Sequence, residues 1–128
     1  MNNGWSREDH ALKGDDIAQR LLDYGVRVIR LAQSLLKNAT GRHVAGQLLR
    51  AGTSAGANYE EARGAESRAD FIHKLGIAWK EMRESRYWLR LIHRAALLTP
   101  KRIELLLGEA DELSAILSKS LATARKNC

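Results

Sequence analysis

Residues 70–96 read DFIHKLGIAWKEMRESRYWLRLIHRAA, and this stretch has the clearest periodicity in the chain. Small and apolar residues recur at alternating intervals of four and three, which is the spacing of a helix packed along one face in a bundle. Ser67, with Asp70 three positions later, fits the N-cap of this helix. The predicted seam comprises Phe71, Leu75, Ala78, Met82, Ser85, Leu89, Ile92 and Ala96. A second apolar stripe (Trp88, Leu91, Ala95, Leu98) predicts that the later half is more enclosed.

Three further segments show the same kind of pattern. Asp15 and Asp16 open a helix with inward positions Ile17, Leu21, Tyr24, Val28, Leu31 and Leu35, and residues 38–41 then form a turn. A second helix runs from about Arg42 to Ala62, with small residues where a neighbouring helix comes close. Thr99 and Pro100 begin a fourth, with inward positions Ile103, Leu106, Ala110, Leu113 and Leu117.

The pattern predicts an all-α fold, an antiparallel up-down four-helix bundle, because short connections join neighbouring helices and no strand pattern is present. We expect the bundle to occupy residues 15–123. Residues 1–14 are predicted to form a weakly ordered segment and residues 124–128 a frayed tail.

The bulk composition narrows the class of protein. The 128 residues suit one domain, and a formal charge of +6 favours an anionic partner. The only cysteine, Cys128, is the last residue, and we assign it no functional role. Neither a signal peptide nor an apolar run of membrane-spanning length is evident, so we expect a cytoplasmic protein with no membrane association.

Motifs for chemistry are not found. The histidines lack the Glu-x-x-His pairs of di-iron bundles, and the chain lacks the zinc, phosphate-loop and nucleophile-elbow motifs. We therefore expect no metal, no cofactor, no catalytic residues and no enzymatic activity.

A basic stripe follows the helix of residues 70–96. Its cations fall within about a third of the helix circumference at 100° per residue, and aromatic residues lie in or beside the same sector. The residues are Trp79, Lys80, Arg83, Arg86, Tyr87, Arg90 and Arg94. Arg20, Arg27, Arg30 and Lys37 form another basic edge on the first helix. A nucleic-acid site, a subunit interface and a solvated surface all fit such a pattern.

A polar stripe on the second helix comprises Arg50, Ser54, Asn58 and Glu61, and Glu84 of the next helix offers Arg50 a carboxylate. We interpret it as a hydrogen-bonded network that fixes helix register. The alternatives are a ligand or partner site, or a cryptic polar enzyme site.

Two blocks, LRAGTSAGANYEEA at 49–62 and DFIHKLGIAWKE at 70–81, resemble the signature of the four helix bundle protein family. Its members include proteins encoded in intervening sequences of bacterial 23S rRNA genes. The resemblance implies the same bundle and a ring-like homo-oligomer, typically a pentamer. Related proteins are accessory subunits of diversity-generating retroelements, where a basic barrel engages a reverse transcriptase and nucleic acid. The chain departs from the commoner family pattern at residues 59–62.

The leading hypothesis is a non-enzymatic, self-associating bundle that binds RNA or DNA, or a nucleic-acid-processing partner such as a reverse transcriptase. The alternative is a protein–protein interaction scaffold without a nucleic-acid role. Salt dependence separates the two, because contacts to phosphates weaken steeply as salt rises.

Overall fold

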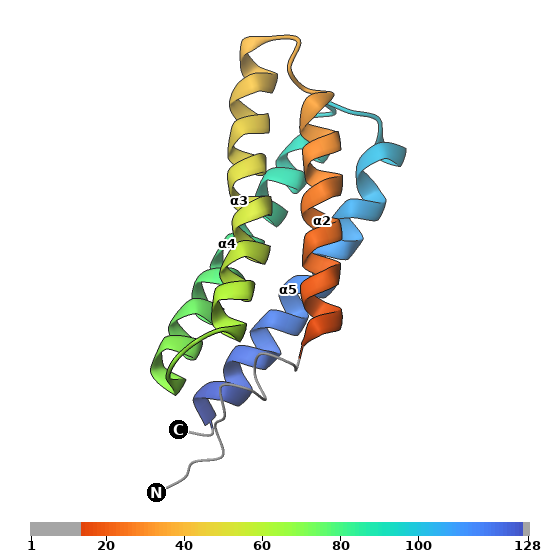
Figure 1. The fold of residues 1–128 in the computed structure, drawn as a ribbon. Helices are drawn as coiled ribbons and strands as arrows, with labels where there is room; N and C mark the ends of the chain where they lie inside the picture. Colours follow the sequence, from red (N-terminus) through yellow and green to blue (C-terminus); the bar gives the residue numbers. More distant parts are fainter. Residues whose placement is uncertain (1–13, 127–128) are drawn as a thin grey trace, which may run out of the picture.

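The fold is the predicted antiparallel four-helix bundle. The computed structural model describes residues 14–126, which form α2 (Asp15–Gln33), α3 (Ala39–Arg63), α4 (Arg68–Arg94) and α5 (Pro100–Lys126). The helices run alternately up and down, so the α2–α3 and α4–α5 connections share one end of the bundle (Figure 1). Contacts between α2 and α3, α3 and α4, α4 and α5, and α2 and α5 close the ring of four. Of the two predicted terminal segments, residues 1–13 and 127–128 lie outside the described residues.

The core consists of the predicted seams. Tyr24, Leu48, Met82, Leu89 and Leu113 are all fully buried. Because each seam occupies one face of its helix, the four faces meet along the bundle axis and leave the charged residues outside.

The small residues of α3 allow α2 to approach closely, as the sequence predicts. A Cβ atom on Gly52 would lie only 2.9 Å from both methyl carbons of Val28. On the facing helix, a Cβ on Gly25 would lie 3.9 Å from the carbonyl oxygen of Gly52. Gly52 therefore lowers the helix propensity of α3 but allows the backbones of α2 and α3 to come into close contact.

The helix boundaries differ from the prediction at three places, and the first is the start of α3. This helix begins at Ala39 rather than near Arg42. The side chain of Asn38 accepts a hydrogen bond from the Gly41 amide at 2.8 Å, which caps the first turn. The residues expected to form a turn are therefore the N-cap and first turn of the helix.

The end of α4 also differs. This helix stops at Arg94, and Ala96 adopts a left-handed conformation with φ of 54°. Hydrogen bonds from Ala96 N to His93 O and from Leu97 N to Ile92 O form a Schellman motif. Ala96 is exposed and not part of the seam. Of the expected second apolar stripe, Trp88 and Leu98 are partly buried against the core, whereas Leu91 and Ala95 are exposed.

At the C-terminal end, α5 continues to Lys126. Residues 124–126 are therefore helical where we expected a frayed tail. Ser67 caps α4 as predicted, accepting a hydrogen bond from the Asp70 amide at 3.1 Å.

Candidate nucleic-acid interface

The outer face of α4 carries most of the predicted basic stripe. One flank of α4 meets α3 and the opposite flank meets α5, so side chains between the flanks point to solvent. Lys80, Arg83, Arg90 and Arg94 are exposed there. Within residues 14–126 none of these four cations has a carboxylate partner within ion-pair distance. Their charges are thus available to an external anion.

Aromatic rings accompany these cations. The Arg83 guanidinium lies 4.9 Å from the centre of the Trp79 ring, a cation–π contact. Tyr87 is 55% exposed and meets Trp88 edge to face, with 5.2 Å between the ring centres. His43 of α3 also meets Trp88 edge to face, with 6.1 Å between the ring centres. Tyr87 is therefore an exposed aromatic ring beside the basic residues, an arrangement that suits contact with a nucleobase.

Not every predicted cation belongs to this surface. Arg86 forms an ion pair with Asp111 of α5, so its charge is neutralised within the bundle. Arg20 donates to both carboxylate oxygens of Glu109, at 2.7 and 3.1 Å, and the hydrogen bond to Glu109 raises the pKa of Arg20.

The remaining α2 cations, Arg27 and Arg30, have no carboxylate partner among the described residues. Because α2 packs against α3 and α5, they lie on a different side of the bundle from the α4 cations. The two predicted basic edges therefore face different sides of the bundle, and only their last members, Arg30 and Lys37 of the one and Arg94 of the other, lie at the same end of it.

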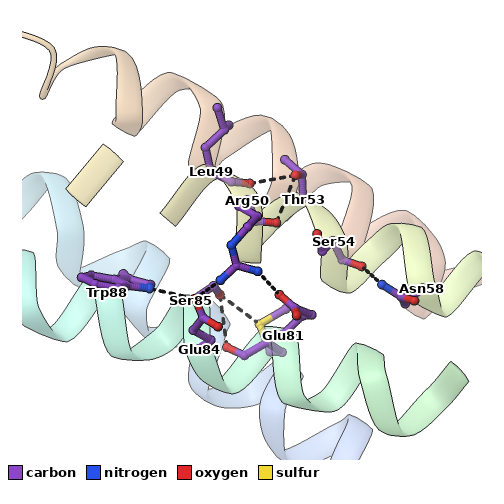
Figure 2. A network of polar contacts seen from close by, with 10 residues as sticks. Leu49, Arg50, Thr53, Ser54, Asn58, Glu81, Glu84, Ser85 and Trp88 are labelled. Carbon is purple, nitrogen blue, oxygen red and sulfur yellow. Dashed lines mark hydrogen bonds and ion pairs between the residues drawn. The ribbon is translucent and has the colours of Figure 1, made fainter. Parts of the chain in front are cut away.

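The predicted polar stripe forms three separate groups rather than one buried network. Arg50 contacts Glu84, as expected, and also Glu81 at 3.0 Å (Figure 2). Glu84 further accepts a hydrogen bond from the Trp88 indole at 3.1 Å. The Arg50 side chain is 49% exposed, so this cluster clamps α3 to α4 at the surface.

The other stripe members point to different partners. Asn58 donates to the Ser54 carbonyl at 2.9 Å within α3, and Glu61 pairs with Lys74 at 2.9 Å. Each carboxylate of the stripe is matched by a cation, which favours positioning of helices over acid–base chemistry. Within residues 14–126 no group of three or more His, Cys, Asp or Glu is placed to hold a metal ion.

The sequence pattern did not predict a buried polar pair at the bundle centre. The Tyr24 hydroxyl lies 2.6 Å from Ser85 Oγ, and Ser85 Oγ donates to the Met82 carbonyl at 3.1 Å. Tyr24 therefore donates to Ser85. Burial raises the pKa of Tyr24 to about 12. The position of Ser85 in an otherwise apolar seam was the signal in the sequence that could have indicated this pair.

An exposed apolar face on α2 was also missed. Leu22 is 62% exposed, and Val26, Ile29 and Leu36 follow it on the surface. Beside them, a groove of about 540 Å³ runs between α2 and α3, lined in part by Gly25, Gly56 and Ala57. Positions 22, 26 and 29 have helical spacing, so the sequence does indicate a second apolar stripe on α2.

These features define a helical-bundle protein that has an unpaired basic face, an exposed apolar face and, in its described part, no metal cluster. The family model of the 23S rRNA-intervening sequence protein matches residues 14–119, and the chain belongs to that family. The recognition made from the two sequence blocks is therefore confirmed.

A solved structure gives the same fold. It is a protein of unknown function from the S23 ribosomal protein family of Bacteroides thetaiotaomicron, 36% identical to this chain. The match covers 87% of this chain and 99% of that one, with a TM-score of 0.79. No curated protein matches. No helix within residues 14–126 combines the length and the apolar character that a membrane span requires.

Proposed function

We propose that this protein is a non-enzymatic bundle that binds nucleic acid, RNA in the first instance, through the outer face of α4. The observation that carries the proposal is the row of exposed cations without carboxylate partners, Lys80, Arg83, Arg90 and Arg94, beside the exposed ring of Tyr87. Phosphates favour such cations, and unpaired bases stack on such rings. The family name, which refers to an insertion in ribosomal RNA, supports the same direction.

The test is binding of a fluorescently labelled 20-nucleotide single-stranded RNA of mixed sequence, followed by anisotropy at several salt concentrations. The variant Lys80→Gln/Arg90→Gln/Arg94→Gln removes three exposed cations of α4 that form no ion pair with a carboxylate of residues 14–126. The control Lys119→Gln/Arg125→Gln/Lys126→Gln removes three exposed cations from α5.

We expect the α4 variant to bind more weakly and to lower the slope of log affinity against log salt by about 2, since each phosphate contact to a single strand contributes about 0.7. The control should retain nearly the wild-type slope. Equal losses in both variants would contradict a site on α4.

A protein–protein scaffold is the second candidate, and the apolar face of α2 favours it. Monomeric proteins rarely expose large contiguous apolar patches, and three exposed residues, Leu22, Val26 and Ile29, together line the α2–α3 groove. RNA binding that is undetectable at low salt, combined with a stable complex that resists high salt, would favour this function.

Both candidate functions, nucleic-acid binding and a protein–protein scaffold, are compatible with self-association of the chain. A second copy of the chain is a natural occupant of the α2 face, and the family resemblance suggests a ring of five. Light scattering after gel filtration, with and without RNA, measures the mass and shows whether RNA binds the assembled form.

A further inference from the structure

The acidic residues are distributed unevenly along the chain. Residues 24–59 and 85–103 contain ten Lys and Arg and no Asp or Glu. The rest of the chain carries all fifteen Asp and Glu against eleven Lys and Arg. The basic surplus therefore resides entirely in two segments that are distant in sequence.

The fold brings six of these ten cations to one end of the bundle. The first segment contains the α2–α3 connection and the second contains the α4–α5 connection, and both connections lie at the upper end in Figure 1. This end, which we call the basic end, presents Arg30, Lys37, Arg42, Arg94, Lys101 and Arg102, all of them exposed.

Side-chain contacts join the helix termini of the basic end into one surface. Arg102 of α5 donates to Ser34 Oγ at the end of α2, and Arg42 of α3 donates to the Leu36 carbonyl at 3.3 Å. On the α4 side, His93 lies 3.8 Å from Glu104 of α5. None of the six cations of the basic end forms an ion pair with a carboxylate of residues 14–126.

A cluster of cations without carboxylate partners lowers the stability of the fold, and a surface that only contacts water has no need of such a cluster. Six like charges at one end repel one another and destabilise the compact state, whereas an anion that bridges several of them relieves the repulsion. A polyanion with regularly spaced phosphates matches several separated cations at once, which a single carboxylate does not. The aromatic cluster of Tyr87, Trp88 and His43 adjoins this end through α3 and α4.

We propose that the basic end is the principal nucleic-acid contact, and that a single strand runs from the α2–α3 and α4–α5 connections onto the outer face of α4. This inference rests on the proposed function and extends it to residues outside the α4 stripe. Lys37, Arg42, Lys101 and Arg102 become determinants of affinity, whereas Arg20 and Arg86, each paired with a carboxylate, do not.

The test adds one variant to the pair described above, in the same anisotropy assay with the same RNA. Arg30→Gln/Lys37→Gln/Lys101→Gln removes three exposed cations of the basic end, none of them on α4 and none in an ion pair with a carboxylate of residues 14–126. We expect at least a tenfold loss of affinity near 0.1 M salt and a salt slope smaller by about 2. The α5 control should stay within about twofold of the wild type, and unchanged thermal melting would show that all variants fold.

The outcomes separate the two proposals. If the basic-end variant binds as the wild type while the α4 variant is impaired, the proposed function stands and the basic end is overturned. If the α5 control loses as much affinity as the basic-end variant, net charge alone governs binding and the basic end is again overturned. If the wild-type protein takes up no RNA at low salt, the proposed function itself fails.

Discussion

At the residue scale, Ala96 shows where the chain departs from its best local conformation. It occupies the position after a helix end that glycine favours, because a left-handed conformation costs a residue with a Cβ about 1–2 kcal/mol. We expect Ala96→Gly to raise the free energy of unfolding by roughly 0.5–1 kcal/mol, since relief of this strain exceeds the entropy that glycine loses on folding. Urea denaturation measures the change.

A second alanine supplies the control for that substitution. Ala115 is exposed in the middle of α5, where glycine should cost about 1 kcal/mol. A loss of stability in both variants would show that the Schellman motif after α4 does not impose strain at Ala96.

The buried hydroxyl of Tyr24 makes stability depend on alkaline pH. Burial raises the pKa of Tyr24 from 10.0 to about 12. Between these values the unfolded chain loses a proton that the folded chain retains, so stability falls as pH rises. The contribution is complete below pH 10 and is lost by about pH 12, amounting to at most about 3 kcal/mol.

The variant Tyr24→Phe isolates this effect from the titration of surface lysines. Loss of the bond to Ser85 should cost about 1 kcal/mol at neutral pH, because Ser85 Oγ keeps its bond to the Met82 carbonyl. Urea midpoints at pH 9 and pH 11.5 should then differ less for the variant than for the wild type. Equal differences would contradict the assignment.

At the element scale, the α2–α3 contact depends on a single missing side chain. Gly52→Ala would place a Cβ 2.9 Å from the methyl groups of the buried, conformationally stiff Val28. We expect a net loss of about 1–2 kcal/mol, as overpacking outweighs the gain in helix propensity. Gly46→Ala, on the same helix with nothing within 4 Å of the new atom, should instead stabilise by roughly 1 kcal/mol. Thermal melting of the two variants in parallel tests the contrast.

Elements were predictable where their signals are local and repeated. The seam of α4 from Leu75 to Ile92 follows from spacing, and the Ser67 cap follows from one side chain; both occur as expected. The start of α3 was missed because Asn38 caps a helix with residues that are equally typical of a turn. Ala96 was misplaced because its spacing continues the seam although the backbone has already turned left-handed.

At the scale of the whole molecule, the candidate site was only partly predictable. Spacing places Arg83, Arg86 and Arg90 on one sector of α4, but it does not show which cations meet a carboxylate of another helix. Arg86 meets Asp111 and Arg20 meets Glu109, at sequence separations of 25 and 89 residues. Such pairs depend on which helices are neighbours, and the gathering of Lys37 and Lys101 at one end depends on the direction of each helix.

The exposed apolar face of α2 allows a test of whether copies of the chain associate. Leu22 is 62% exposed beside the α2–α3 groove, whereas Leu105 is 78% exposed on α5, apart from that groove. If the α2 face joins copies of the chain, Leu22→Glu should bury a charge against an apolar partner and shift the protein to monomers. Leu105→Glu adds the same charge at a more exposed leucine and should leave the mass unchanged. Light scattering after gel filtration compares the two. A wild-type monomer, or dissociation by both substitutions alike, would remove the α2 face as the subunit interface.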